Sequence, residues 1–198
     1  LPKGLLSIGD SAFSYCSGLT SIIIPESVTS IGDSAFSNCN NLSSIVISDS
    51  VTSIGSNAFE ECDSLKSVML SNSLLSISDY TFSGCDSLQS VTLPKGLLSI
   101  GNYAFSYCTS LSSIIIPNSV TTIGDYAFDW CWLDEITLSD GLVTIGEGAF
   151  EGCSLTKVNI PKTVKKIGDN AFSGDFLSVV ITQDNVEIGD DAFGSDTV

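Results

Sequence analysis

Cysteine is the residue type in this chain that offers the most chemistry, because a thiolate acts as a nucleophile, binds zinc and forms disulfides. Seven cysteines are present, and histidine is absent. They recur every 23 residues, with a last interval of 22, at Cys16, Cys39, Cys62, Cys85, Cys108, Cys131 and Cys153. Equal intervals give parallel Cβ–Sγ bonds, which do not converge as a disulfide requires. Without histidine or a C-x-x-C pair, zinc binding is also disfavoured. We therefore predict small, buried, structural side chains.

Acidic residues form a second regular series, which allows two interpretations. Stacked carboxylates are suitable ligands for calcium, a hard cation that takes about six to eight oxygen atoms. Ser56 and Asn102 replace Asp at two positions, however, and both residue types suit a helix cap better than a calcium site. We therefore predict helix capping, and we assign no metal ligand, cofactor or catalytic residue. The members of the series are Asp10, Asp33, Asp79, Asp125, Asp169 and Asp190, with Asn102 and Glu147 in register.

Composition excludes several classes of function. The chain has 198 residues, of which 43% are hydrophobic, and its 23 acidic residues against seven lysines give a net charge of −16. Nucleic acids and anionic membranes repel such a chain, so neither is an expected partner. No apolar run approaches the ~18 residues of a membrane-spanning helix, so we expect no membrane insertion. No signal peptide is visible and the first residue is Leu1, so we expect a mature product or part of a longer array.

The cysteine interval is the period of a repeat that covers residues 1–198. In the unit Ile24–Val46, IPESVTSIGDSAFSNCNNLSSIV, the apolar residues Leu42, Ile45 and Ile47 follow the L-x-x-L-x-L spacing of a leucine-rich repeat strand. We predict a single leucine-rich-repeat solenoid of about eight to nine stacked coils of 21–23 residues. Each coil is expected to contain a short β-strand, a second short extended segment and one helical turn. The coils begin at residues 1, 24, 47, 70, 93, 116, 138 and 160, with a partial coil from 181.

The pattern within one coil predicts which side chains are buried. Ile45 and Ile47 alternate with Val46, so we expect the first two to point inward and Val46 to point outward. Gly32 ends the second extended segment, where a positive φ is expected. Asp33 is then placed to cap the following helical turn. From that turn the Ala, Phe and Cys of the A-F-x-x-C motif are expected to face the interior, with one Phe stacked on the next in every coil.

The full motif, L-x-x-I-x-I-P-x-x-V-x-x-I-G-x-x-A-F-x-x-C, resembles the BspA-type leucine-rich repeat, also called the Treponema pallidum type. The resemblance covers essentially the whole chain. It departs locally where Asp175 replaces the cysteine of coil eight, and where Ser78 and Thr81 replace Gly and Ala in coil four. The resemblance implies a cell-surface or secreted location. It also implies adhesion to extracellular matrix, to host-cell protein or glycan, or to other microbial surfaces, and it brings no catalytic residues.

Aromatic residues gather on the predicted helical side of coils four to six. The first and fifth positions of the turn share an outward face there. Exposed aromatic clusters are typical of binding surfaces, although rings that simply pack on one another explain the same pattern. The candidate binding residues on this side are Tyr80, Tyr103, Tyr107, Tyr126, Trp130 and Trp132.

The predicted strand side offers a second candidate surface. Its outward positions form a mainly apolar stripe flanked by serine hydroxyl groups, which suits a partner surface. Ordinary β-propensity at half-exposed positions explains the stripe equally well. The candidate residues on this side are Ile23, Val46, Met69, Thr92 and Ile115.

We expect a non-enzymatic recognition module that binds extracellular protein or glycan. The alternative is a structural array, because neither end carries a polar capping repeat and uncapped solenoid ends favour end-to-end self-association. An enzyme is disfavoured, because histidine, a nucleophile elbow and a Gly-rich phosphate loop are all absent. Asn41 lies in one N-glycosylation sequon, Asn41-Leu42-Ser43.

Overall fold

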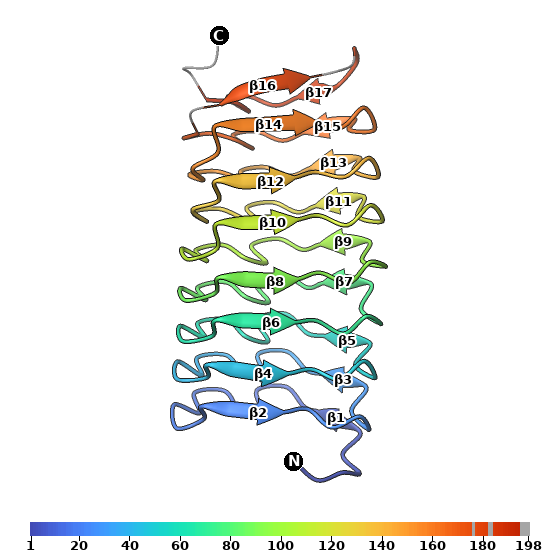
Figure 1. The fold of residues 1–198 in the computed structure, drawn as a ribbon, viewed down its shortest axis with the longest axis vertical. Coiled ribbons are helices and arrows are strands. Elements are labelled where there is room, and N and C mark those ends of the chain that lie inside the picture. Colours follow the sequence, from blue (N-terminus) through green and yellow to red (C-terminus); the bar gives the residue numbers. More distant parts are fainter. Residues whose placement is uncertain (176, 182–183, 195–198) are drawn as a thin grey trace.

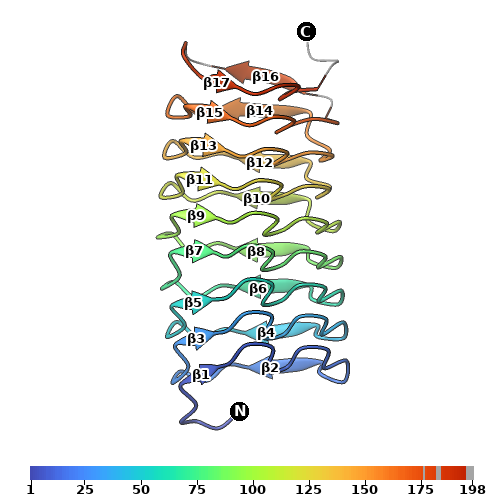
Figure 2. The same ribbon diagram turned by 180° about the vertical axis from the view of Figure 1, so that it is seen from behind.

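The computed structural model of the chain describes residues 1–175, 177–181 and 184–194. Short coils stack in one column, with the N-terminus at one end and the C-terminus at the other (Figure 1). Each complete coil contributes one strand to a first face and a two-residue strand to a second face, which is seen from the front in Figure 2. The predicted solenoid of stacked coils is therefore confirmed.

We call the first face the strand face. Its strands pair in parallel with equivalent residues opposite one another, so that Ser21 faces Ser44 and Ile22 faces Ile45. The hydrogen-bonded pairs are β2–β4, β6–β8, β10–β12 and β14–β16. The strands are β2 (Ser21–Ile23), β4 (Ser44–Val46), β6 (Ser67–Met69), β8 (Ser90–Thr92), β10 (Ser113–Ile115), β12 (Glu135–Thr137), β14 (Lys157–Ile160) and β16 (Ser178–Ile181).

The second face also consists of parallel strands in register. It forms a three-stranded sheet, β1-β3-β5, and a six-stranded sheet that runs from β7 to β17. These strands are β1 (Ser7–Ile8), β3 (Ser30–Ile31), β5 (Ser53–Ile54), β7 (Ser76–Ile77), β9 (Ser99–Ile100), β11 (Thr122–Ile123), β13 (Thr144–Ile145), β15 (Lys166–Ile167) and β17 (Glu187–Ile188).

Columns of identical side chains fill the interior, as the sequence predicts. Ile45 and Ile47 are buried while Val46 is 58% exposed. The phenylalanines from Phe13 to Phe193 form one continuous stack, whose ring centroids are 5.1–5.6 Å apart. One coil buries too little apolar surface to fold alone, so this shared core makes the coils depend on their neighbours.

The predicted helical turn is wrong: no helix is present in the described residues. The segment instead places its first and fifth residues in the left-handed region, at φ 53° for Ser34 and 58° for Asn38. The N–H groups of Ser34, Phe36 and Asn38 consequently donate to carbonyl groups of the next coil at 2.7–2.8 Å. A helix would direct these donors along its own axis, so the turn gains an inter-coil ladder that a helix lacks. We call these segments, each taken with the residue of the Asp series that precedes it, the turn segments, and we count turn positions from the residue after that one. The turn segments are 10–16, 33–39, 56–62, 79–85, 102–108, 125–131, 147–153 and 169–175.

The expected positive φ at Gly32 is also wrong, because the positive φ angles lie later in the turn segment. Gly32 is required for a different reason: a Cβ atom there would lie 2.6 Å from the backbone nitrogen of Asp10. The Asp10 carboxylate accepts the N–H of Asp33 at 2.9 Å. The acidic series therefore caps backbone donors, as predicted, but those of the next coil rather than of its own turn.

One boundary between coils departs from this arrangement. Ser56 stands at the Asp position of coil three, and directly above it Ser78 replaces the glycine of coil four. The Ser78 hydroxyl donates to the carbonyl of Ile54 at 2.6 Å. The second face is interrupted between β5 and β7, at this same boundary. Loss of the carboxylate, loss of the glycine and the break in the sheet thus coincide.

Candidate binding site on the turn face

The cysteines are structural, as the sequence predicts. All seven are free thiols, and six are buried. The Cys62 Sγ donates to the carbonyl of Phe36 at 3.2 Å, and the same bond recurs from coil to coil. Burial raises the pKa of Cys62 to about 12, so the nucleophilic thiolate is scarce at neutral pH. A thiol donor explains why cysteine, rather than a purely apolar residue, occupies this column.

Asp175 takes the place of cysteine in coil eight. Its Oδ1 accepts the Leu155 N–H at 3.0 Å, whereas its buried Oδ2 has no hydrogen-bond partner. Burial raises the pKa of this carboxyl to about 7, because a buried carboxylate loses its hydration. Coil eight therefore contains a group that changes its protonation near neutral pH inside the core.

The outward surface of the turn segments, which we call the turn face, carries the predicted aromatic residues. The predicted outward orientation of the first and fifth positions is correct, although the backbone is left-handed rather than helical. All five tyrosines of the chain occupy these positions, with φ between 55° and 59°, and Trp130 has φ 51°. Other coils place Ser11, Ser34 or Glu61 there, or else asparagine and glycine, which tolerate this conformation better, such as Asn38, Asn57 and Gly148.

The structure divides the six predicted aromatic residues into three groups. Tyr80, Tyr103 and Tyr126 form one stack, with centroid distances of 4.7 and 5.0 Å. Tyr107 and Trp130 form a second, looser pair at 6.4 Å. Trp132 follows in the shortened loop and is 61% exposed, whereas Tyr107 and Trp130 are 52% and 50% exposed. The second pair and Trp132 therefore present the most accessible aromatic surface.

Both stacks end at glycines of coil seven. A Cβ atom on Gly148 would lie against the Tyr126 ring, 2.5 Å from its Cδ1, and one on Gly152 would lie 3.2 Å from the Trp130 ring. The Tyr126 hydroxyl donates to Oε1 of Glu147 at 2.6 Å. This hydrogen bond, followed by burial, raises the pKa of Tyr126. Coil seven thus contributes two glycines, against which the Tyr126 and Trp130 rings pack, and the carboxylate that accepts the Tyr126 hydroxyl.

A buried carboxyl group lies next to the exposed aromatic pair in the chain. Asp129 immediately precedes Trp130 and is only 7% exposed, with the Ser106 hydroxyl donating to its Oδ2 at 3.3 Å. Burial, and then the negative charge of Glu151, raises the pKa of Asp129 to about 6. The aromatic residues therefore lie in a strongly negative environment.

The strand-face candidates lie where the sequence predicts. Exposed fractions are 70% for Ile23, 58% for Val46, 72% for Met69 and 74% for Ile115, and Thr92 is also exposed. They project from β2, β4, β6, β10 and β8, so they form a stripe along successive coils. Their role in binding stays a prediction.

Sequence reasoning missed several exposed side chains, among them Tyr15, Leu75 and Leu98. Tyr15, which is 75% exposed, occupies the fifth turn position of coil one, and reading the Tyr107 column down the stack identifies it. Leu75 and Leu98 lie side by side just before β7 and β9, with exposed fractions of 58% and 48%. The L-L-S-I sequences of coils four and five carry that signal, because the repeat places only the first leucine and the isoleucine in the core.

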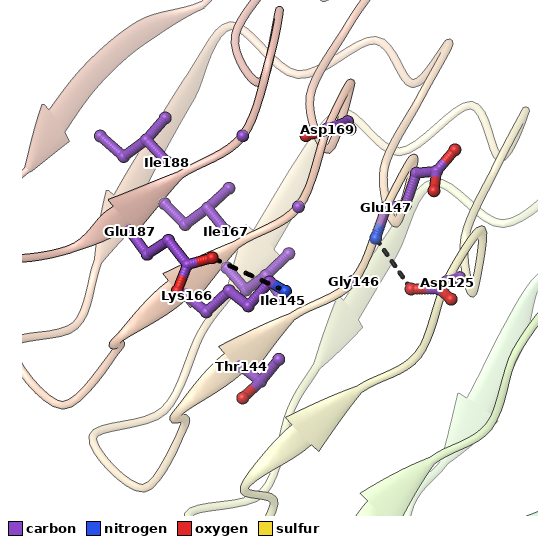
Figure 3. A pocket seen from close by; sticks show the side chains of 12 residues that line it. Asp125, Thr144, Ile145, Gly146, Glu147, Lys166, Ile167, Asp169, Glu187 and Ile188 are labelled. Carbon is purple, nitrogen blue, oxygen red and sulfur yellow. Dashed lines mark hydrogen bonds and ion pairs between the residues drawn. The ribbon is translucent and has the colours of Figure 1, made fainter.

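A shallow groove of about 330 Å³ follows the glycine column of coils six to nine, and Figure 3 shows the residues around it. Asp125 Oδ1 accepts the N–H of Glu147 there at 2.9 Å, and Lys166 pairs with Glu187 at 3.8 Å. The groove exists because glycine leaves no side chain between the Ile and Asp columns. The Asp125 carboxylate already accepts a backbone N–H there. We therefore interpret the groove as a consequence of coil stacking rather than as a binding site.

In the part of the chain that the structure describes, no group of three or more Cys, Asp or Glu side chains is arranged to hold a metal ion. The same residues contain no helix long and apolar enough to traverse a bilayer.

These features define a parallel β-solenoid of the leucine-rich-repeat class. The family model for the BspA type leucine rich repeat region matches residues 1–112 and 98–197. The chain belongs to this family, which consists of repeat proteins that are generally not enzymes. No curated protein sequence matches the chain.

Solved structures show the same architecture. A leucine-rich repeat protein from Bacteroides ovatus is 27% identical with a TM-score of 0.58, over 96% of this chain and 56% of that one. The Treponema pallidum leucine-rich repeat protein is 28% identical with a TM-score of 0.59, over 89% of this chain and 75% of that one. A pneumococcal vaccine antigen is similar in fold, with 22% identity and a TM-score of 0.51, over 96% of this chain and 58% of that one. The chain thus spans little more than half the length of the Bacteroides protein.

Proposed function

We propose that the chain is a non-enzymatic recognition module, located at the cell surface or secreted, that binds an extracellular protein or glycan through its turn face. Membership of a family of repeat proteins supports binding over catalysis. The observation that carries the choice of face is the backbone conformation of the aromatic residues. Tyr107 and Trp130 occupy left-handed positions, at φ 58° and 51°, and are half exposed.

Stability alone does not favour aromatic residues at these positions. A residue with a Cβ atom in the left-handed region costs about 1–2 kcal/mol, and asparagine tolerates it better. Stacking returns about 0.5–1.5 kcal/mol for each aromatic pair, but Tyr15 has no ring partner in the described residues and is 75% exposed. Strained residues that persist on a surface are typical of functional sites. Binding provides a reason for aromatic residues where asparagine would fold as well.

The strand-face stripe is the second candidate surface, because Met69 and Ile115 are more than 70% exposed on a face otherwise rich in serine. The two faces are separable by mutation. Tyr107→Asn/Trp130→Asn removes the accessible rings and retains a residue type that accepts positive φ, as Asn38 does in the same column. Ile115→Ser alters only the strand face.

The test is a binding screen against extracellular-matrix proteins, host-cell surface proteins and glycans, with wild type and both variants. We expect at least one ligand whose affinity falls about tenfold or more with Tyr107→Asn/Trp130→Asn and is unchanged with Ile115→Ser. Thermal unfolding of each variant controls for loss of fold. Ligands that respond only to Ile115→Ser would move the site to the strand face.

A further inference from the structure

The turn face is negatively charged along the whole described chain. No lysine lies in a turn segment: the seven lysines are Lys3, Lys66, Lys95, Lys157, Lys162, Lys165 and Lys166. Every turn segment except that of coil five contains at least one carboxylate. Lys166–Glu187 is the one ion pair among the described residues, and it lies on the second face. The carboxylates of the turn face therefore have no cationic partner within the described chain.

Two groups of carboxylates flank the accessible aromatic pair. On the N-terminal side, Gly84 leaves no side chain between Glu61 and Tyr107, and the Glu61 carboxylate lies over Gly84, 2.9 Å from the position of a Cβ atom. On the C-terminal side, the buried Asp129 immediately precedes Trp130 in the chain, and the Trp130 N–H donates to the carbonyl of Glu151 at 2.8 Å. The Glu151 carboxylate lies over Gly148, 3.1 Å from the position of a Cβ atom. In this column Glu61 of coil three is therefore followed by Gly84, Tyr107, Trp130 and Gly152 of the next four coils, so that a carboxylate precedes two neighbouring rings.

The electrostatic state of these carboxylates is unfavourable in the free chain. Burial, and then the charges of Asp63, Glu60 and Asp86, raises the pKa of Glu61. Burial and Glu151 act on Asp129 in the same direction. Each of these effects disfavours the ionised form, and a bound cation would reverse them. Rings beside uncompensated carboxylates suit a cationic side chain, because a guanidinium or ammonium group interacts with both.

We propose that the Tyr107–Trp130 pair and its flanking carboxylates bind a lysine- or arginine-bearing segment of a partner protein. This inference rests on the proposed function and specifies the chemistry of the ligand. Charge complementarity attracts the basic segment, its cationic groups pair with Glu61 and Glu151, and the buried Asp129 senses their positive charge. Its aliphatic stems cover the rings. A basic partner is favoured over an acidic or neutral one, because the chain has a net charge of −16 and no lysine on this face.

The test uses a short synthetic peptide of alternating arginine and glycine, with a glutamine–glycine peptide of the same length as the neutral control. Binding is measured by calorimetry at two salt concentrations. We expect saturable binding of the arginine peptide, weaker at high salt, and none of the glutamine peptide. Tyr107→Asn/Trp130→Asn should weaken binding about tenfold or more, and Glu61→Gln/Glu151→Gln several-fold.

Glu26→Gln is the matched charge control, because Glu26 is exposed in the turn between β2 and β3 and lies outside the turn segments. It should leave the affinity for the arginine peptide unchanged. NMR detection of the Asp129 carboxyl gives an independent readout: its pKa should fall when the arginine peptide binds. Urea unfolding curves confirm that each variant is folded.

Three outcomes would overturn the inference. These are absence of binding, equal binding of the neutral peptide, or an affinity reduced as much by Glu26→Gln as by Glu61→Gln/Glu151→Gln, which would indicate general attraction to an acidic chain. If the arginine peptide fails but a protein or glycan from the screen depends on Tyr107 and Trp130, only the cationic specificity is wrong. If no ligand depends on these rings, the proposed function itself fails.

Discussion

Coils four to six and coils seven and eight use the same turn backbone for different purposes. The earlier coils place Tyr or Trp in every left-handed position except that of Gly84, whereas the later coils place Gly148, Gly152, Asn170 and Gly174 there. The interior differs as well, because Cys85, Cys108 and Cys131 give way to Asp175 in coil eight. The backbone itself therefore does not dictate these side chains. The aromatic residues are a departure from what the turn prefers, and apart from Tyr15 of coil one they gather in coils four to six.

The largest expected effect on stability concerns Asp175, the residue in the core of coil eight. Asp175→Asn keeps an acceptor for the Leu155 N–H and removes the buried charge. The folded pKa of Asp175, about 7, lies above the value of about 3.9 in an unfolded chain. Its stabilising contribution is therefore complete below about pH 4 and is lost as the pH rises through 7. We expect Asp175→Asn to be more stable than wild type by about 2–3 kcal/mol at pH 8.

Urea unfolding of both proteins from pH 4 to pH 8 measures this effect, because the difference between them isolates Asp175 from the other carboxylates. The advantage of the variant should grow across that interval. A constant difference would show that Asp175 is not held in the core as described.

The glycines of coil seven provide the next test. Gly148→Ala forces a Cβ atom against the Tyr126 ring and into positive φ, so we expect a loss of about 2 kcal/mol in the free energy of unfolding. Asn170→Ala, at the equivalent position one coil later, lacks the overlying ring and should cost only about 1 kcal/mol.

A double-mutant cycle with Tyr126→Asn separates the two contributions, because it removes the ring and leaves the backbone term. Equal losses for Gly148→Ala and Asn170→Ala would contradict the packing of Tyr126 on coil seven.

The smallest effect concerns the hydrogen bond that joins the two regions. Glu147→Gln replaces a charged acceptor of the Tyr126 hydroxyl with a neutral one, so the pKa of Tyr126 should fall toward the ordinary value of about 10. Stability at pH 7 should change by less than about 1 kcal/mol. NMR titration of the Tyr126 ring carbon measures the shift. A raised pKa that survives in Glu147→Gln would assign it to burial alone.

The buried positions were predictable from the sequence, because the apolar pattern of one repeat identifies them without knowledge of their partners in other coils. Phe36, Ile45 and Cys39 lie where alternation and the 23-residue repeat place them. The turn conformation was not predictable in this way. S-A-F-S-N-C has an acceptable helical pattern, and a helix is excluded only because the next coil offers carbonyl groups to alternate N–H donors.

The candidate site shows the same division. Sequence alone identified the six aromatic residues and their outward positions, since a column in a repeat has one orientation. It did not reveal that Tyr103 is enclosed between two rings while Tyr107 and Trp130 remain accessible, because stacking depends on the distance between coils.

The amino-acid sequence by itself thus determined the period, the columns and the distinction between inside and outside. Tertiary structure decided the left-handed turns, the close approach that requires Gly32, and the pairing of each Asp with the following coil. These features arise between coils rather than within one. Hydrogen bonds and steric contacts between neighbours of identical sequence exist only once the coils are stacked, so no single repeat specifies them.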